Sequence, residues 1–202
     1  MIRLKKTDII LASGERGTGK STAAMYFASM FPRYVVYDAL GEYMQEGFEN
    51  VYIPNSADSE EFDRFGTYVW AVGNMMVVID ECETFMPEGK VLAPSMFRII
   101  MQGRHKDLGM ICTTKRIAEL KKTLVSQAKY ILLFRHFLRN DIEYIRAFAG
   151  DRAYELKNLK DHRFMLYSMG ELTGPYILNL DGKNGGDGRK GLLKGELNVN
   201  LE

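Results

Sequence analysis

Short apolar runs alternate with helix-like segments along the first 135 residues of the chain. Each run has polar residues or glycines at its ends, as is typical of strands that are buried on both faces of a parallel sheet. The predicted strands are residues 7–13, 34–37, 75–79, 109–113 and 130–134. Helices are predicted at residues 21–30, 93–102 and 117–127. The alternation therefore predicts an α/β fold, with a mostly parallel central sheet and helices on both faces.

The last third of the chain follows a different pattern. Residues 141–149 and 153–159 are predicted helices, and residues 164–169 and 175–180 predict a C-terminal β-hairpin around the glycines at 170 and 174. The segment 181–202 contains six glycines and balanced charge, which favours a flexible tail. We therefore expect one domain over residues 1–180 and a Gly-rich flexible C-terminal tail over residues 181–202.

Composition limits the class of protein. A chain of 202 residues with 46% hydrophobic and 26% charged residues is long enough for one folded domain and too apolar to be disordered. Its longest apolar runs fall well short of the roughly 20 residues that span a bilayer, so no transmembrane helix is expected. The basic N-terminus leads into a glycine-rich turn and not into a signal-peptide cleavage site, which disfavours secretion. Cys82 and Cys112 stand far apart and are expected to be buried thiols.

Charge is uneven along the chain, although the net charge is only +1. Residues 38–63 contain acidic side chains and no Lys or Arg, whereas residues 102–122 are mostly basic among their charged positions. Two segments of opposite charge favour a ring of identical subunits that dock head to tail, or a basic rim that faces a polyanion. Ordinary solvated helix faces would give the same pattern.

A glycine-rich segment between the first predicted strand and the first helix matches the motif GxxxxGK[ST] at every position. In such a loop the small glycines let successive backbone amides face a polyphosphate, Lys20 reaches the terminal phosphates, and the Ser21 hydroxyl binds Mg²⁺. The expected nucleotide-binding residues are Gly14, Glu15, Arg16, Gly17, Thr18, Gly19, Lys20, Ser21 and Thr22.

Two adjacent carboxylates follow the strand at residues 75–79. Asp80 is the candidate to hold Mg²⁺, usually through water, in the manner of a Walker B aspartate. Glu81 is the candidate to orient and deprotonate the attacking water. Glu83 is a second candidate for that role, and it lies further beyond the strand end.

Four stretches together resemble the HerA/FtsK group of additional-strand P-loop ATPases, which pump DNA. Within that group the chain resembles the small genome-packaging ATPases of membrane-containing double-stranded DNA viruses. The stretches are GERGTGKS, then YDALGEY at residues 37–43, VVIDE at residues 77–81, and GRHKDLGMICTTKR at residues 103–116 followed by SQAKYILLFR at residues 126–135. The second is similar to a family DxxGEY motif, and the last to RHxGxGhhxxTQR followed by a strand and an arginine.

The resemblance implies a P-loop NTPase of the additional-strand type, in which the five predicted strands lie in the order 5-1-4-3-2. It also implies ATP as the nucleotide and an active site between subunits of a ring, completed by an arginine from the neighbour. Arg104 is the favoured arginine, Arg116 competes with it, and Arg135 is a third choice. At Lys115 the family usually has glutamine; lysine can only donate hydrogen bonds and adds a charge, although it could still contact phosphate as a catalytic sensor.

The function expected from this resemblance is ATP-driven translocation of double-stranded DNA, as in packaging a viral genome into a capsid. The expected partners are double-stranded DNA, bound without sequence preference by basic residues such as Lys121 and Lys122, further copies of the chain in a hexameric or pentameric ring, and capsid or portal-type vertex proteins. The expected location is the host cytoplasm or the virion vertex. The alternatives are a zonula-occludens-toxin-like phage assembly ATPase, a P-loop nucleotide kinase, and a nucleotide-gated binding module without turnover.

Overall fold

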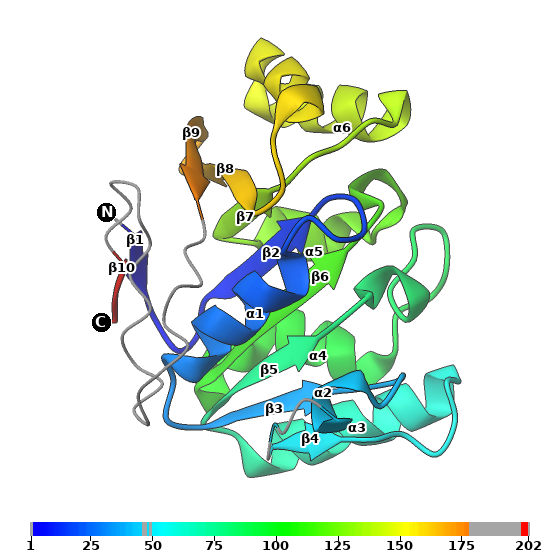
Figure 1. Ribbon diagram of the computed structural model, residues 1–202. Helices are drawn as coiled ribbons and strands as arrows, with labels where there is room; N and C mark the ends of the chain where they lie inside the picture. The colour runs from blue at the N-terminus through cyan, green and yellow to red at the C-terminus, as the bar shows by residue number, and fades with distance from the viewer. Residues whose placement is uncertain (1, 46–47, 49, 178–198, 202) are drawn as a thin grey trace.

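The computed structural model of this protein describes residues 2–45, 48, 50–177 and 199–201. Within these residues the chain forms one eight-stranded sheet and one two-stranded sheet (Figure 1). The strands are β1 (Ile2–Leu4), β2 (Ile9–Ser13), β3 (Tyr34–Tyr37), β4 (Val51–Tyr52), β5 (Met75–Ile79), β6 (Leu108–Thr114), β7 (Tyr130–Leu133), β8 (Arg163–Ser168), β9 (Glu171–Ile177) and β10 (Val199–Leu201). The α-helices are α1 (Lys20–Ser29), α2 (Glu42–Gln45), α3 (Ser59–Val72), α4 (Pro94–Gln102), α5 (Lys122–Gln127) and α6 (Arg139–Ala149). The 3₁₀ helices are η1 (Cys82–Thr84), η2 (Gly103–Lys106), η3 (Ile117–Glu119) and η4 (Asp151–Asn158).

The large sheet confirms the strand order that the resemblance implies. Its order is β4-β3-β5-β6-β2-β7-β8-β9, so the five predicted strands lie in the order 5-1-4-3-2. The additional strand β6 lies between β2 and β5, where Cys112 pairs with Leu11 on one side and Ile79 on the other. The pairs from β4 to β7 are parallel, so their carboxyl ends meet at one edge of the sheet. The predicted phosphate loop and Asp80 both follow strands at that edge.

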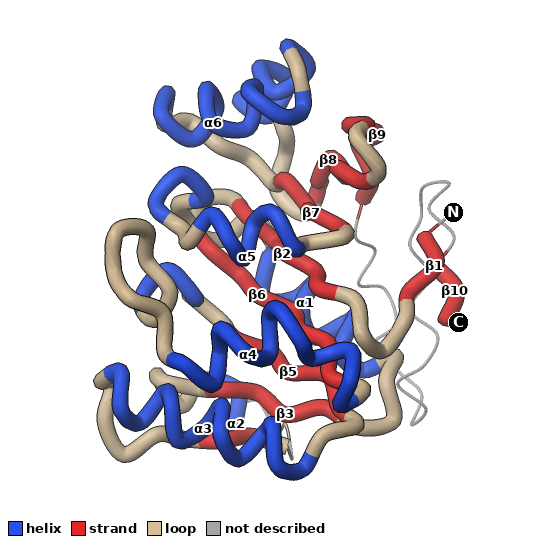
Figure 2. The backbone as a smooth tube through the Cα atoms, turned by 180° about the vertical axis from the view of Figure 1, so that it is seen from behind, coloured by secondary structure: helices blue, strands red, loops and turns tan. Residues whose placement is uncertain are grey.

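Helices cover both faces of the sheet, as predicted. Helix α1 covers one face (Figure 1), and α3, α4 and α5 cover the other (Figure 2). Successive residues of a strand point to opposite faces, so β2 sends Ile9 and Leu11 into one hydrophobic cluster and Ile10 and Ala12 into the other. This burial on both faces explains why the sequence of each central strand is a continuous apolar run.

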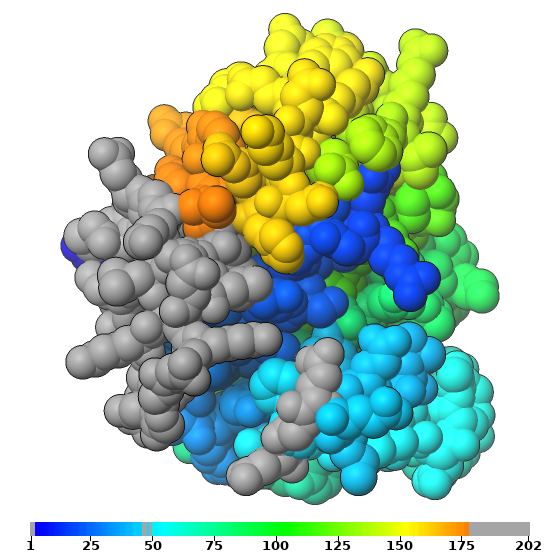
Figure 3. All heavy atoms as spheres, in the orientation of Figure 1, coloured from blue at the N-terminus to red at the C-terminus, as the bar shows by residue number. Residues whose placement is uncertain are grey.

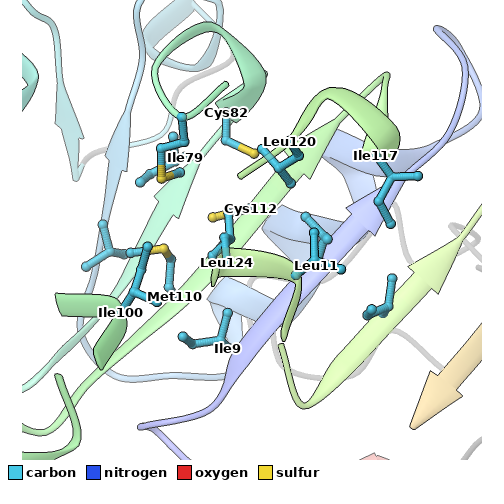
Figure 4. Close-up of a cluster of buried hydrophobic side chains, with 14 of the residues drawn as sticks. Ile9, Leu11, Ile79, Cys82, Ile100, Met110, Cys112, Ile117, Leu120 and Leu124 are labelled. Atoms are coloured by element: carbon cyan, nitrogen blue, oxygen red, sulfur yellow. The ribbon is translucent and has the colours of Figure 1, made fainter. Parts of the chain in front are cut away.

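Cys82 and Cys112 are free, buried thiols in the cluster under α4 and α5 (Figure 4). Burial raises the pKa of the Cys82 thiol well above its ordinary value. Both side chains therefore serve as apolar core residues, as expected from the sequence.

Helix α3 is absent from the sequence-based prediction. Its apolar face is formed by Phe62, Phe65 and Val69, and the Asp58 carboxylate caps its N-terminus by accepting a 2.8 Å hydrogen bond from the Glu61 amide. The capping residue followed three positions later by glutamate is the signal that could have identified it. Without this signal, the acidic residues around the cap indicate only a charged segment.

The helix predicted at residues 117–127 is wrong as a continuous element. It divides into η3 and α5 because Leu120 forms a β-bridge with Pro87, and the Lys121 amide donates to the Met86 carbonyl at 2.9 Å. These contacts with the loop after β5 hold Leu120 in an extended conformation and Lys121 in a non-helical one.

The C-terminal β-hairpin is confirmed, with a tighter turn than predicted. Strands β8 and β9 pair antiparallel, and only Met169 and Gly170 connect them, both at positive φ (53° and 84°) as in a two-residue hairpin turn. Strand β9 therefore begins at Glu171, several residues before the predicted second strand. The expected flexible tail at 181–202 lies outside the described residues, except for Val199–Leu201, which pair in parallel with β1. Among the described helices, none has the length and apolar character needed to cross a bilayer.

Candidate nucleotide site

The phosphate loop joins β2 to α1 and is fixed to the strands on either side of it. The Gly14 amide donates to the Thr114 carbonyl at 3.1 Å, and the Glu15 amide donates to the Arg135 carbonyl at 2.9 Å. Gly14 has a φ of +154°, and an added Cβ there would lie 2.6 Å from the Cβ of Phe134. Gly19, at φ +101°, would place a Cβ 2.9 Å from His162 Nδ1. Glycine is therefore required at both positions by backbone conformation and by close packing.

Lys20 is the first residue of α1, and its side chain reaches back to the loop. Its ammonium donates to the Glu15 carbonyl at 2.7 Å, and the same carbonyl accepts from the Thr18 hydroxyl at 2.7 Å. Burial lowers the pKa of Lys20, and the charges of Asp80 and Glu83 act in the opposite direction. Within the described part of the chain, no carboxylate forms an ion pair with Lys20, so its charge is available to an anionic ligand.

Asp80 is surrounded by hydroxyl groups. The Ser21 hydroxyl lies 3.2 and 3.3 Å from its two oxygens, and the Tyr43 hydroxyl donates to Oδ2 at 2.6 Å. The Thr113 hydroxyl donates to Oδ1. The structure thus brings together Ser21 and Asp80, the two residues predicted to hold Mg²⁺, although they are 59 positions apart in the sequence.

The donors at this point suit Mg²⁺. Mg²⁺ prefers oxygen ligands and commonly takes one or two from the protein and the rest from phosphates and water. The hydroxyl of Ser21 and the carboxylate of Asp80 fit that set. Over the described ranges, no group of three or more His, Cys, Asp or Glu side chains forms a complete metal site by itself.

Glu81 and Lys115 face each other at the same edge of the sheet. The Glu81 backbone is left-handed, with φ +48°, and its amide donates to the Thr113 hydroxyl at 3.1 Å. Its carboxylate forms an ion pair with the Lys115 ammonium, and the Lys115 amide donates to Glu83 Oε1 at 2.9 Å. Lys115, predicted as a phosphate sensor, is thus in contact with both candidates for the catalytic base.

Glu81 and Lys115 line one cavity of about 260 Å³ together with Lys20, Ser21 and Asp80. In the space-filling view (Figure 3), the blue segment that includes the phosphate loop reaches the surface between the cyan part of the chain and the yellow-green part. The lining residues are Arg16, Gly17, Lys20, Ser21, Leu40, Glu42, Asp80, Glu81, Thr113 and Lys115. Residues of the phosphate loop, the β5 end and the β6 end therefore meet in one pocket.

The three candidate arginines have different environments. Arg116 pairs with Asp141 at 2.9 Å and with Glu119 at 2.8 Å, and Arg135 pairs with Asp161 at 2.9 Å. Arg104 is exposed on η2 at the opposite edge of the sheet, where it lines a separate cavity of about 360 Å³. Arg104 lies before the first residue of β6, and the nucleotide pocket lies at the other end of this strand, near Thr114. The seven residues of β6 extend over about 20 Å. None of the three lines the nucleotide pocket of its own chain.

Three contributors to the site were not predicted as site residues. Tyr43 and Thr113 hold the Asp80 carboxylate, and His136 lies beneath the loop with its Nε2 3.3 Å from the Ser13 hydroxyl. Tyr43 lies within the DALGEY stretch, which marked the resemblance but suggested no contact. Burial and the charge of Asp80 raise the pKa of Tyr43, so its hydroxyl remains a donor. Burial lowers the pKa of His136 to about 4, so that imidazole is neutral at pH 7.

The comparisons with known proteins identify the fold. The sequence matches no protein-family model, and it matches no curated protein. Among solved structures, the genome packaging NTPase B204 from Sulfolobus turreted icosahedral virus 2, in complex with ATP-gammaS, is similar with a TM-score of 0.70 and 20% identity, over 84% of this chain and 98% of that chain. The DNA-packaging ATPase B204 from Sulfolobus turreted icosahedral virus is similar with a TM-score of 0.70 and 20% identity, over 83% of this chain and 97% of that chain. The N-terminal domain of zonular occludens toxin from Neisseria meningitidis is similar with a TM-score of 0.50 and 16% identity, over 62% of this chain and 75% of that chain. The fold of this chain is therefore the P-loop NTPase fold that the resemblance implies.

Proposed function

We propose that this chain is an ATP-driven translocase of double-stranded DNA that packages a viral genome into a capsid. The observation that carries the proposal is the meeting of Lys20, Ser21, Asp80 and Glu81 in one pocket of about 260 Å³. The fold is shared with two proteins named as a genome packaging NTPase and a DNA-packaging ATPase, and these supply the DNA substrate of the proposal.

The proposed nucleotide is ATP with Mg²⁺. ATP-gammaS and AMPPCP are bound in similar structures, which supports ATP. The triphosphate would lie on the amides of residues 14–22, with the Lys20 ammonium on its terminal phosphates. Ser21 would bind Mg²⁺ directly and Asp80 through water, and the metal would neutralise the charge that develops on the phosphates.

Glu81 is the proposed general base. Its carboxylate accepts a proton from the attacking water, whose oxygen bonds to the γ-phosphorus while the bond to the β-phosphate oxygen breaks. Lys115 engages Oε1 of Glu81, and a γ-phosphate that draws the ammonium away would leave both carboxylate oxygens to the attacking water. Lys115 would then be free to donate to the γ-phosphate, which is the sensor role proposed for it.

The site is proposed to be completed by an arginine from a neighbouring subunit in a hexameric or pentameric ring. Arg104 is the preferred residue because it is exposed and forms no ion pair across the described residues. Arg116 and Arg135 are held by carboxylates of their own chain, which makes them second choices. An arginine supplied in this way accelerates phosphoryl transfer by about 10³- to 10⁵-fold in other P-loop enzymes.

DNA would be held through its phosphates and without sequence preference. Lys122 is the first residue of α5 and Lys121 precedes it, near the loop that follows β5, and Lys122 is largely exposed. Lysines bind phosphate through charge, which gives affinity but no sequence information. Capsid or portal-type vertex proteins are the proposed further partners, and the host cytoplasm or the virion vertex is the proposed location.

A second candidate function is a phage assembly ATPase of the zonula-occludens-toxin type. The observation that favours it is the similarity in fold to the zonular occludens toxin domain. That similarity covers 62% of this chain, against 84% for the packaging NTPase, so packaging is the preferred function.

The decisive experiment measures phosphate release from ATP with and without long duplex DNA. The proposal expects turnover that duplex DNA stimulates and that Lys20→Ala abolishes, whereas Lys157→Ala, at an exposed position on η4, leaves it unchanged. ATP hydrolysis that duplex DNA does not alter would contradict the translocase. Transfer of the phosphate to a nucleoside monophosphate would instead identify a kinase.

A further inference from the structure

The YDALGEY stretch at residues 37–43 forms contacts that the proposed mechanism does not use. Asp38 follows β3, is 2% exposed, and accepts hydrogen bonds from the amides of Glu42, Tyr43 and Met44 at 3.1, 3.0 and 3.3 Å. A buried carboxylate with three amide donors fixes the start of α2 tightly. The short helix α2 is therefore attached to the end of β3, next to the strand that carries Asp80.

This attachment turns Tyr43 toward the nucleotide site. The Tyr43 side chain is 5% exposed, and its ring packs against Phe48 with ring centroids 6.0 Å apart. Its hydroxyl donates to Asp80 Oδ2 at 2.6 Å. Because both the ring and the backbone of Tyr43 are held, the hydroxyl has little freedom to leave Asp80.

The three hydroxyl groups that contact Asp80 have different roles. Ser21 is itself a proposed metal ligand, and Thr113 donates to Oδ1. Tyr43 is the contact that holds Oδ2 without being a ligand. A hydroxyl orients the carboxylate without neutralising it, whereas a lysine or arginine in this place would oppose the binding of a cation.

We propose that Tyr43 is a positioning residue that orients the Asp80 carboxylate for the metal of a bound metal–nucleotide complex, and that Asp38 holds Tyr43 in place through α2. This inference rests on the proposed function, since it concerns the same site. In this inference the segment Asp38–Tyr43 contributes to metal binding, and the phosphate loop binds the nucleotide.

The experiment compares Tyr43→Phe with the unchanged protein, using Mn²⁺ as the metal and AMPPCP as the nucleotide. Electron paramagnetic resonance of free Mn²⁺ measures metal binding, and fluorescence competition in EDTA measures nucleotide binding without metal. Loss of a hydrogen bond to a direct metal ligand lowers metal affinity by about 10- to 100-fold, and the lower end applies here because Asp80 would hold the metal through water. We expect a loss of about tenfold in Mn²⁺ affinity for Tyr43→Phe and unchanged nucleotide binding in EDTA.

Tyr130→Phe is the matched control. It also removes one hydroxyl donor, because Tyr130 donates to the Arg3 carbonyl at 2.7 Å, and this bond lies away from the pocket. Tyr130→Phe is expected to leave Mn²⁺ affinity unchanged. A shift of the same size in both variants would mean that general destabilisation caused it, and would overturn the positioning role.

A second variant keeps the inference testable if Tyr43→Phe does not fold. Asp38→Asn weakens the attachment of α2 and keeps the Tyr43 hydroxyl, so it should lower Mn²⁺ affinity by a smaller factor, about threefold. Unchanged Mn²⁺ affinity in a folded variant of either kind would overturn the inference. If the unchanged protein binds neither AMPPCP nor Mn²⁺ with it, the proposed function fails, which is a different result.

Discussion

The Lys115 ammonium forms an ion pair with the Glu81 carboxylate at the edge of the nucleotide pocket. Both side chains are about two-fifths exposed, at 38% and 39%, so the pair lies where water and a triphosphate can reach it. The Lys115 amide also donates to Glu83, which fixes the backbone of this residue between the two acidic side chains. Glutamine at this position, as in the family that the chain resembles, would carry no charge to pair with Glu81.

Replacing Lys115 tests whether its charge contributes to hydrolysis. Loss of a hydrogen bond to a charged group costs about 1.5–3 kcal/mol, which corresponds to roughly 10- to 100-fold in rate if the bond forms in the transition state. We expect Lys115→Ala to lower kcat for phosphate release by that factor. Lys115→Gln retains a donor, so its loss should stay within about tenfold. A Lys115→Ala variant that turns over like the unchanged protein would contradict a catalytic role.

Replacing each glutamate separately distinguishes the two candidates for the general base. A positioned base contributes about 10²- to 10⁴-fold to a rate, so Glu81→Gln should reduce kcat by at least about 100-fold and leave ATP affinity within a few-fold. Glu83→Gln is the matched control and should retain most of the activity, because Glu83 is bonded to the Lys115 amide. Steady-state phosphate release and nucleotide titration provide both measurements. Inactivity of Glu83→Gln alone would transfer the role to Glu83.

The sequence is sufficient to predict which candidate residues lie at the carboxyl ends of strands. Gly14, Asp80 and Lys115 each lie at or just after the end of a predicted strand, and parallel strands bring their carboxyl ends to one edge. Apolar periodicity alone could not provide the strand order, because pairing partners are not encoded in a single strand. The order 5-1-4-3-2 came from the resemblance.

The parts that the sequence could not predict depend on contacts between distant segments. Tyr43 reaches Asp80 because Asp38 fixes α2, and no local pattern indicates that two residues 37 positions apart will meet. The division of the predicted helix at 117–127 has the same kind of cause, since the loop after β5 pairs with Leu120. The family glutamine at position 115 could not suggest the ion pair with Glu81, because lysine forms it through a charge that glutamine lacks.

The buried His136 predicts a pH dependence of stability. Its pKa is about 4 in the folded protein because burial disfavours the charged ring, and about 6.5 in the unfolded chain. Between pH 4 and pH 6.5 the unfolded chain therefore binds a proton at this histidine more readily than the folded protein does. The free energy of unfolding is consequently unaffected by protonation of His136 above pH 6.5 and decreases as the pH falls toward 4. The difference corresponds to about 3 kcal/mol. Denaturant titrations between pH 4 and pH 7 give the free energy of unfolding at each pH. This free energy should fall more steeply with decreasing pH in the unchanged protein than in His136→Gln, and the same pH dependence in both would contradict this prediction.

Close backbone packing predicts that Gly109 cannot be replaced. An added Cβ would lie 2.1 Å from the Lys6 carbonyl oxygen and 2.8 Å from that of Asp8, and backbone atoms cannot move aside cheaply. Gly109→Ala should lower the free energy of unfolding by about 3 kcal/mol, at the upper end of overpacking costs. Gly89→Ala is the control, because its Cβ would meet nothing within 4 Å and only its φ of +82° is unfavourable, which costs about 1 kcal/mol. Equal losses for the two variants would contradict the packing argument.

Mixing experiments test whether Arg104 acts on the nucleotide of a neighbouring subunit. Arg104→Ala and Glu81→Gln chains should each be inactive alone. In a head-to-tail ring assembled from equal amounts of both, about a quarter of the sites combine an intact Glu81 with an intact Arg104 from the neighbour, so phosphate release should partly return. Arg116→Ala has a different expected effect, because it leaves the buried Asp141 without its ion pair and should destabilise the fold by about 3–5 kcal/mol. If mixing restores no activity while both chains fold and assemble, Arg104 does not act across the interface, and the same test with an Arg135→Ala chain examines the remaining candidate.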